Sequence, residues 1–259
     1  PSRPLHDGHY GNWVPNPAAM LVRLLASMRD DEGHILIPGF YADVTPLTPA
    51  ERQAIDALPE VETGLKRDLQ LGRSEANGAR LADALQQPAL NIRGLRGGGV
   101  GDNAANAITT TAQASIDFRL VPGETNDGVR KRFDDYVRSQ GWFVVDHAPT
   151  PQERMAHPKV IRLDWSMGYD AQRTPLDLPV AQAFAAAVER SVDGPIVRMP
   201  MMGGSVPMHT FAVDLDTPVV GLAFVNPDNN QHAANENLRL SNLWRGIEVY
   251  AGVLTGLSW

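Results

Sequence analysis

The sequence predicts a chain of two parts, an α+β domain over residues 1–170 and an α/β part over residues 171–259. Two observations predict this division. Residues 112–120 alternate strictly between apolar and polar side chains, which indicates a strand of an antiparallel sheet with helices on one face only. After about residue 170, apolar strands alternate with helical segments, which is typical of a parallel sheet covered on both faces.

The first part opens with two well-marked helices. Asn16 and Pro17 provide an N-cap and a proline at the first helical position, and the apolar residues from 20 to 28 follow helical spacing. Residues 48–58 begin with a capping box, a threonine followed three residues later by a glutamate. Residues 59–90 are charged and weakly periodic, so we expect them to be helical in parts.

The strands of the first part follow these helices. Residues 89–103 predict a strand that runs into a glycine-rich loop, and the alternating strand 112–120 comes next. A helix is predicted from about 126 to 140, because apolar residues form one stripe and a glycine follows. Two further strands are predicted within 142–147 and 159–169, and we expect the sheet to be largely antiparallel.

The second part is predicted to alternate between helices and strands. A helix carries apolar residues from 180 to 188, and apolar strands are predicted at 196–200 and 217–224. A final helix carries an apolar stripe from 243 to 254. Because the strand at 217–224 is apolar throughout, we expect it to be buried on both faces.

Composition restricts the function. Of 259 residues, 43% are hydrophobic and 20% charged, which is typical of globular proteins, and no apolar run approaches the roughly 18 to 20 residues that span a bilayer. The net charge of −7 argues against a nucleic-acid partner. The absence of cysteine excludes disulfides and thiolate ligands, so any metal must bind His, Asp or Glu.

The chain opens with PSRPLHDGHYGNW, which has neither an initiating Met nor a signal-peptide pattern. The expectation is that it begins within a longer protein, with any localisation signal outside the sequence. A cytoplasmic location is expected.

The loop in GLAFVNPDNNQHAANENLRL presents a candidate metal ligand. His232 follows the carboxyl end of a predicted parallel strand, where ligand sites in open α/β sheets gather. A neutral imidazole can bind zinc from such a loop, although an isolated loop histidine is more often a surface residue. Asn235 and Glu236 are expected to hold the loop or to cap the next turn.

Three glycine-containing segments have alternative interpretations. GGSVP, with Gly204 and Ser205, either holds a carboxylate on its backbone N–H groups or forms a tight turn before a helix. RGGGVGDN favours a flexible hairpin over a phosphate loop. In LHDGHYGN, the glycines are expected to keep His6 and His9 off a common face; His6 then has a substrate-contacting or structural role and His9 none.

These motifs together resemble a known family. LHDGHYGNWVPNPAAMLVRLLASM, GHILIPGFY, SIDFRLVPGET, GGSVP and QHAANENLRL occur in the order and spacing of peptidase family M20, the zinc aminoacylase, carnosinase and carboxypeptidase-G group. The resemblance covers nearly the whole chain, and the GHILIPGF segment and the long lid domain are most similar to the dipeptidase branch.

The resemblance implies a lid domain over 1–170 that forms a homodimer, followed over 171–259 by the C-terminal portion of an α/β zinc-peptidase catalytic domain with two zinc ions. The implied substrate is a small peptide or an N-acyl amino acid with a free carboxylate. The implied site residues are His6 at the oxyanion, Asn106 as a polar lid contact, Arg119, Gly204 and Ser205 at the carboxylate, and His232 as the last metal ligand.

The sequence departs from the family pattern in two places. The usual HSG is HDG here, with Asp7 beside His6. The sequence also has no H-x-D and no Glu-Glu, so most metal ligands and the general base are missing, and a catalytic zinc needs about three protein ligands. The chain alone is therefore predicted to be inactive. The alternative is a stand-alone dimerisation or interaction module, although such a module would have no need of GGSVP and the His232 loop.

Overall fold

The computed structural model describes residues 1–166, 168–204 and 206–257, and the chain forms two compact units. The first unit comprises residues 1–45 and 60–171, and the second comprises residues 46–59 and 172–259. Residues 46–59 thus belong to the second unit although they lie early in the sequence. The assignment of a lid to 1–170 and of a catalytic portion to 171–259 stays a prediction.

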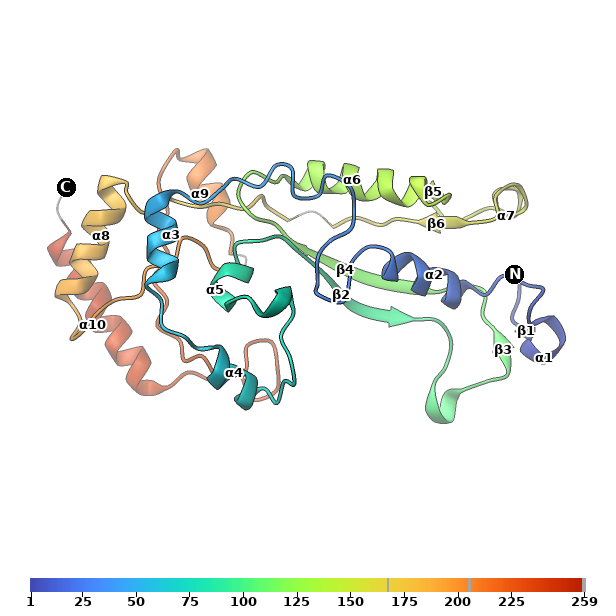
Figure 1. The fold of residues 1–259 in the computed structure, drawn as a ribbon, viewed down its shortest axis with the longest axis horizontal. Helices are drawn as coiled ribbons and strands as arrows, with labels where there is room; N and C mark the ends of the chain where they lie inside the picture. Colours follow the sequence, from blue (N-terminus) through green and yellow to red (C-terminus); the bar gives the residue numbers. More distant parts are fainter. Residues whose placement is uncertain (167, 205, 258–259) are drawn as a thin grey trace. The chain divides into compact units, whose positions relative to one another are not determined.

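A long antiparallel ladder is the centre of the first unit. Strand β2 (Ala89–Arg96) pairs with β4 (Gln113–Arg119), and the two run side by side in Figure 1. The register runs from Ala89 opposite Arg119 to Arg96 opposite Gln113 and shifts between Ile92 and Gly94. Both strands were predicted from the sequence, and both are confirmed.

Two short strand pairs extend this unit. Strand β1 (Leu5–His6) pairs antiparallel with β3 (Ala107–Ile108). Strand β5 (Phe143–Val145) pairs with β6 (Val160–Arg162), and this pair is parallel. The strands predicted in 142–147 and 159–169 are therefore confirmed, while their parallel direction departs from the expected antiparallel arrangement.

Two helices cover one face of the long ladder. They are α2 (Pro17–Ala26) and α6 (Asn126–Ser139), and their apolar residues form one core with the inward side chains of β4. The Phe118 ring stacks on Phe40 and Trp165 at 5.9 and 6.0 Å and meets Phe133 edge-on at 5.5 Å. The one-sided α+β layer predicted from the alternation in β4 is thus confirmed.

The helix ends in this unit are capped as the sequence indicates. The Asn16 side chain accepts the backbone N–H of Ala18 at 2.9 Å, and the Thr125 hydroxyl accepts that of Gly128 at 3.1 Å. The remaining helical segments are short: α1 (Asp7–Tyr10), α4 (Glu62–Asp68), α5 (Leu81–Ala84), α7 (Pro151–Ala156) and 3₁₀ turns at Ala76–Gly78 and Gly101–Asn103.

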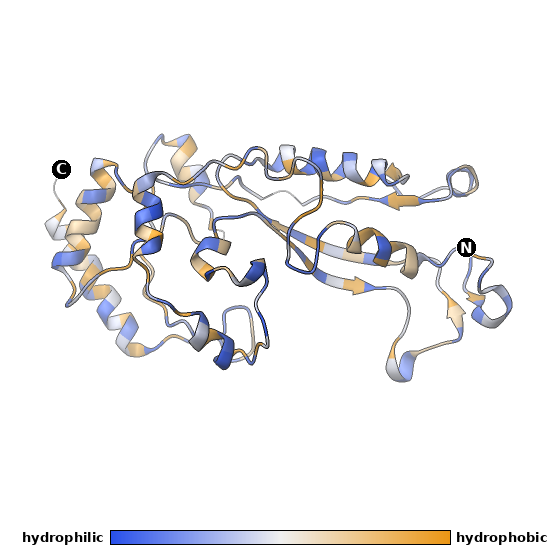
Figure 2. Cartoon of the chain, viewed as in Figure 1, coloured by the Kyte–Doolittle hydropathy of each residue, from blue (hydrophilic) through white to orange (hydrophobic). Residues whose placement is uncertain are grey.

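The second unit is helical. It contains α3 (Pro49–Asp56), α8 (Pro179–Arg190), α9 (Met208–Asp214) and α10 (Leu240–Gly256). Figure 2 shows apolar and polar residues alternating around α8 and α10. Their facing apolar residues form a small core: Ala187, Val188, Val249 and Val253. Within the described parts of the chain, no helix combines the length and the apolar character needed to cross a bilayer.

The two strands predicted at 196–200 and 217–224 are wrong for this structure. Among the described residues of the second unit, none is assigned to a strand. The physical reason is that a strand requires a neighbour for its backbone hydrogen bonds, and a periodicity in one segment does not supply that neighbour.

A buried ion pair joins the two sequence segments of the second unit. Glu51 is fully buried, and the Arg173 Nε lies 3.0 Å from its Oε1. The other carboxylate oxygen accepts the backbone N–H of Thr48 at 2.7 Å and completes the capping box of α3. A second Arg173 nitrogen donates to the carbonyl of Pro46 at 2.8 Å. Residues 46–51 are thereby fixed to the segment that opens with residue 172.

Replacing Arg173 by Met tests this pair. The change leaves a buried carboxylate without its cation, so we expect the second unit to lose about 3–5 kcal/mol of unfolding free energy. Arg198→Met is the matched control, because the Arg198–Glu189 pair at 2.6 Å is exposed and such pairs contribute up to about 1 kcal/mol. Urea-induced unfolding measures both; equal losses in the two variants would contradict the prediction.

A second buried carboxyl closes the turn between β4 and α6. Glu124 is 2% exposed, its Oε2 accepts the backbone N–H of Val121 at 3.0 Å, and its Oε1 has no hydrogen-bond partner within the described chain. Burial raises the pKa of Glu124 to about 7, against the lowering effects of the Val121 N–H and of Arg132, while Asp43 raises it further. The adjacent Gly123 has a φ of +98° and packs against the backbone of Asp43 too closely for any side chain.

Glu124 should make the first unit less stable as the pH rises. The folded state keeps the proton to about pH 7, whereas the unfolded state loses it near 4.5, so stability falls between these values and the loss is complete above them. Glu124→Gln keeps the acceptor for Val121 and removes the charge. We expect it to stabilise the protein at pH 8 by up to about 3 kcal/mol and to have little effect near pH 4. Urea unfolding from pH 4 to 8 measures this, and a constant difference between the two proteins would contradict it.

Candidate functional site

The short pair of β1 and β3 brings His6 next to Asn106. His6 lies opposite Ala107 in the register, and the backbone N–H of Asp7 donates to the carbonyl of Asn106 at 3.2 Å. His6 is about half exposed, and Asn106 is exposed as well. Two predicted site residues, 100 positions apart in sequence, thus lie together at one end of the first unit.

The local hydrogen bonds fix the tautomer of His6. Its Nδ1 accepts the backbone N–H of Gly8 at 3.1 Å, and the Asp7 carboxylate accepts the same N–H at 2.8 Å. Because Nδ1 is an acceptor, the neutral ring carries its proton on Nε2. The Asp7 Oδ1 lies 3.7 Å from Nδ1. The Nε2–H of this exposed ring can therefore donate a hydrogen bond to the oxyanion of a bound molecule.

His9 lies closer to His6 than the sequence predicted. The segment Asp7–Tyr10 forms the short helix α1, and the two imidazole rings lie 4.5 Å apart at 37°. The expectation that the glycines keep these rings apart is wrong, because the side chain of His6 caps the Gly8 N–H and allows one helical turn. The pair makes no metal centre, since the described residues contain no group of three or more potential ligands.

Arg119 lies at the other end of β4 from the β1–β3 pair. It is the last residue of the strand, about 20 Å along it from Gln113 at some 3.3 Å per residue. Its Nε contacts the Asp117 carboxylate at 2.7 Å, and Arg93 on the neighbouring strand lies 3.8 Å from the same group. Arg119 is 44% exposed on the polar side of the sheet. The structure therefore separates Arg119 from His6 and Asn106.

The predicted carboxylate-binding turn is described only in part. Gly204 lies in a bend, and a β-carbon placed on it would meet no atom within 4 Å, so it borders open space. Ser205 lies outside the described residues. The helix expected after this turn is α9, which begins at Met208.

His232 occupies a compact loop between residues 226 and 239. Its φ is +64°, and Asn230 and Asn235 are also left-handed at +53° and +62°. The backbone N–H of His232 donates to the Glu236 carboxylate at 3.4 Å, which agrees with the expectation that Glu236 holds the loop. Three left-handed non-glycine residues within six positions are uncommon and concentrate at functional sites.

Sequence reasoning missed the residue that closes this loop. Asn226 is 1% exposed, and its side chain bonds to residues on both sides of His232. The only available signal was its place, an Asn-Pro pair directly after an apolar run, which indicates a turn and no more.

The ligand set of the described chain does not fit a zinc pair. His232 is the one candidate ligand that the resemblance implies, and no three His, Cys, Asp or Glu side chains of the described residues converge on a point. A catalytic zinc needs about three protein ligands. The described chain therefore does not form this centre by itself, and no catalytic step through zinc can be derived from it.

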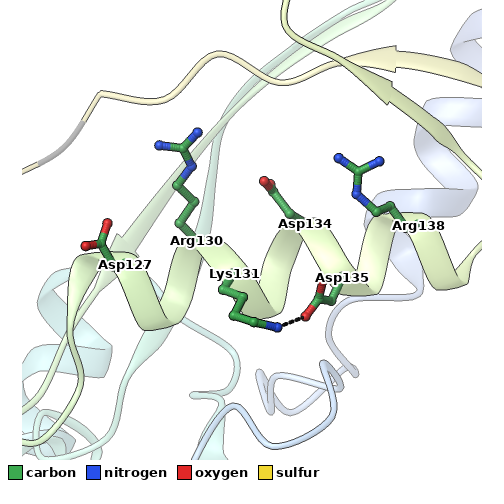
Figure 3. Close-up of a pocket in the computed structure, with 6 residues that line it drawn as sticks. All are labelled: Asp127, Arg130, Lys131, Asp134, Asp135 and Arg138. Atoms are coloured by element: carbon green, nitrogen blue, oxygen red, sulfur yellow. Dashed lines mark hydrogen bonds and ion pairs between the residues drawn. The ribbon is translucent and has the colours of Figure 1, made fainter.

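The outer face of α6 carries a shallow hollow that is unrelated to these residues. Figure 3 shows its lining of three acidic and three basic side chains: Asp127, Arg130, Lys131, Asp134, Asp135 and Arg138. Lys131 and Asp135 pair at 2.5 Å. Because the charges balance, this face is best explained as the solvated side of an amphipathic helix.

Comparison with known proteins identifies most of the first unit. Residues 2–141 match the family model of the M20 peptidase dimerisation domain. Among curated relatives, the Cys-Gly metallodipeptidase DUG1 of Candida albicans is 26% identical over 263 residues, covering 98% of this chain and 50% of that protein. The human Beta-Ala-His dipeptidase is 24% identical over 258 residues, covering 95% and 47%.

Solved structures show the same fold over almost the whole chain. The metallo-carboxypeptidase Sso-CP2 of Sulfolobus solfataricus matches with a TM-score of 0.78 at 24% identity, covering 98% of this chain and 55% of that one. Human carnosine dipeptidase 1 matches with a TM-score of 0.78 at 21% identity, covering 99% and 53%. The chain spans about half the length of the curated relatives it matches.

Proposed function

The chain belongs to the M20 family through its peptidase dimerisation domain, and on this premise we propose that it is the lid and part of the catalytic domain of a zinc-dependent dipeptidase. One observation carries the proposal. The dipeptidase relatives match 95–98% of the chain, so the match must include most of residues 171–259, which lie beyond the dimerisation domain. A stand-alone dimerisation module would need only the first unit.

The proposed substrate is a dipeptide with a free carboxylate. Cys-Gly and β-Ala-His, the dipeptides in the names of the relatives, are the first candidates. An N-acyl amino acid is the second candidate, because it presents the same carboxylate and a similar amide. Arg119 would bind the carboxylate, as guanidinium groups do in bidentate pairs. Gly204 and Ser205 would contact the same group through the backbone.

His6 would donate its Nε2–H to the oxyanion that forms when the amide is attacked. The tautomer supports this role, because Nδ1 is already engaged as an acceptor. Asn106 lies beside it and would contact the substrate with its amide. His232 would be one ligand of a metal pair, and the remaining ligands and the general base would come from polypeptide outside these 259 residues. When bound, the metals would activate the attacking water.

The first test is hydrolysis of Cys-Gly and β-Ala-His dipeptides and of N-acyl amino acids, together with zinc analysis. We expect the 259-residue chain alone to be inactive and to hold less than one zinc per chain, because its ligand set is incomplete. A longer form that carries the missing ligands should hold two zinc ions and cleave the dipeptides. A longer form with two zinc ions and no activity on either substrate class would favour the interaction module.

In such an active form, His6→Ala should lower kcat/KM about 10²- to 10³-fold with unchanged zinc content, because one oxyanion donor is lost. His34→Ala is the control, another half-exposed histidine with a carboxylate partner in the same unit. Arg119→Ala should raise KM, whereas Arg93→Ala should not, although both arginines lie against Asp117. Loss of zinc in either site variant would overturn its role.

A homodimer through the first unit is also part of the proposal, and β2 is the surface that we propose for it. Six consecutive residues of this strand, from Asn91 to Arg96, are exposed, and within the described chain β4 is its only partner. An unpaired strand edge readily pairs with another chain. A cytoplasmic location is proposed as well.

Light scattering after gel filtration tests the dimer. We expect a mass of two chains, and Leu95→Asp on β2 should shift it toward one chain at micromolar concentration. Leu69→Asp is the matched control, since Leu69 is a leucine of similar exposure outside β2. A dimer that survives Leu95→Asp would place the interface elsewhere in this unit.

A further inference from the structure

The loop that carries His232 is closed at its base by one buried side chain. The Asn226 amide nitrogen donates to the Asp228 and Asn237 side chains, each at 3.0 Å. Its Oδ1 accepts the backbone N–H of Arg239, also at 3.0 Å. Asn226 is 1% exposed, so its amide is buried although its three partners are exposed residues. The amide thus links both ends of a twelve-residue loop, 227–238, around His232.

Two further contacts join the same two ends. The backbone N–H of Asn237 donates to the carbonyl of Asn229 at 2.8 Å, and Arg239 pairs with the Asp228 carboxylate at 2.5 Å. The hydrogen bond from Asn226 is the largest effect and lowers the pKa of Asp228; burial opposes it, while the backbone N–H of Asp228 and the charge of Arg239 lower the pKa further. The base of the loop is therefore a network in which Asn226 is the buried member.

Within this closed loop, His232 is held in a backbone conformation that it does not favour. At a φ of +64° the β-carbon crowds the backbone, which is why glycine usually occupies such positions. The shortest hydrogen bond next to His232 joins the Ala233 N–H to the Asn230 carbonyl at 2.9 Å and closes a turn. A single turn does not fix three left-handed residues, so the closure at the base supplies the remaining constraint.

We propose that Asn226 is a positioning residue: its amide closes the loop and thereby holds His232 in the left-handed conformation that presents the imidazole to a divalent cation. The proposal rests on the proposed function for the identity of the cation, zinc. It assigns Asn226 no contact with metal or substrate. It predicts that the strain at His232 exists only while the amide clamp is intact.

A double-mutant cycle in the 259-residue chain tests the clamp. His232→Gly should raise the melting temperature, because glycine accepts a positive φ without strain. Ala233→Gly is the control: Ala233 is not left-handed, so the change should lower the melting temperature. In an Asn226→Ala background, His232→Gly should lose its gain and behave as Ala233→Gly does. Asn226→Asp, which keeps the size and removes both donors, repeats the cycle if the Ala variant unfolds.

A titration with Zn²⁺ alone, in a longer form that carries the remaining metal ligands and followed through the NMR signals of the His232 ring, separates this proposal from the proposed function. A lost stability gain together with at least tenfold weaker zinc binding in Asn226→Asp supports both. A lost gain with His232 signals that do not respond to zinc supports the clamp and overturns the metal role. A gain from His232→Gly that persists unchanged without the Asn226 amide overturns the clamp, whatever zinc does.

Discussion

The one-sided burial of the β2–β4 ladder is the constraint on which the first unit depends. β4 presents apolar side chains to one face and charged ones to the other, so α2 and α6 can cover only the first. Phe118 contacts three aromatic rings from other segments on that face. The opposite face carries Asp117, which is partly buried, and Arg119, which is exposed. The same alternation that builds the core therefore selects which side of the sheet can meet a ligand.

The second unit lacks a comparable sheet among its described residues. Its helices α8 and α10 share a small core, while Trp244, Ile247 and Leu254 on α10 remain exposed. The buried pair of Glu51 and Arg173 joins its two chain segments at one place. Apolar surface of this kind on a helix usually contacts another polypeptide. This agrees with the proposal that the remaining metal ligands lie outside these 259 residues.

Local signals in the sequence predicted much of the fold, and long-range partners explain the rest. The capping box at Thr48 and the alternation in 112–120 act over a few residues, and both are confirmed. The partner of Glu51 lies 122 positions away, and no periodicity points to it. For the site, the pairing of β1 with β3 brought His6 to Asn106, which spacing could not predict. Asn226 was missed because its role depends on burial and on bonds to residues 2–13 positions onward.

The separate positions of His6 and Arg119 in the first unit give a reason why dimerisation would matter for catalysis. His6 lies at one end of the unit, and Arg119 lies about 20 Å along β4 from the strand's other end. An extended dipeptide is only about 7 Å long. One dipeptide therefore cannot contact both residues of one chain in this conformation. If both act on substrate, as we propose, each must serve a different active site. A pair of chains, with each lid contributing to its partner's site as well as its own, meets this requirement, because the two residues then act on separate substrates.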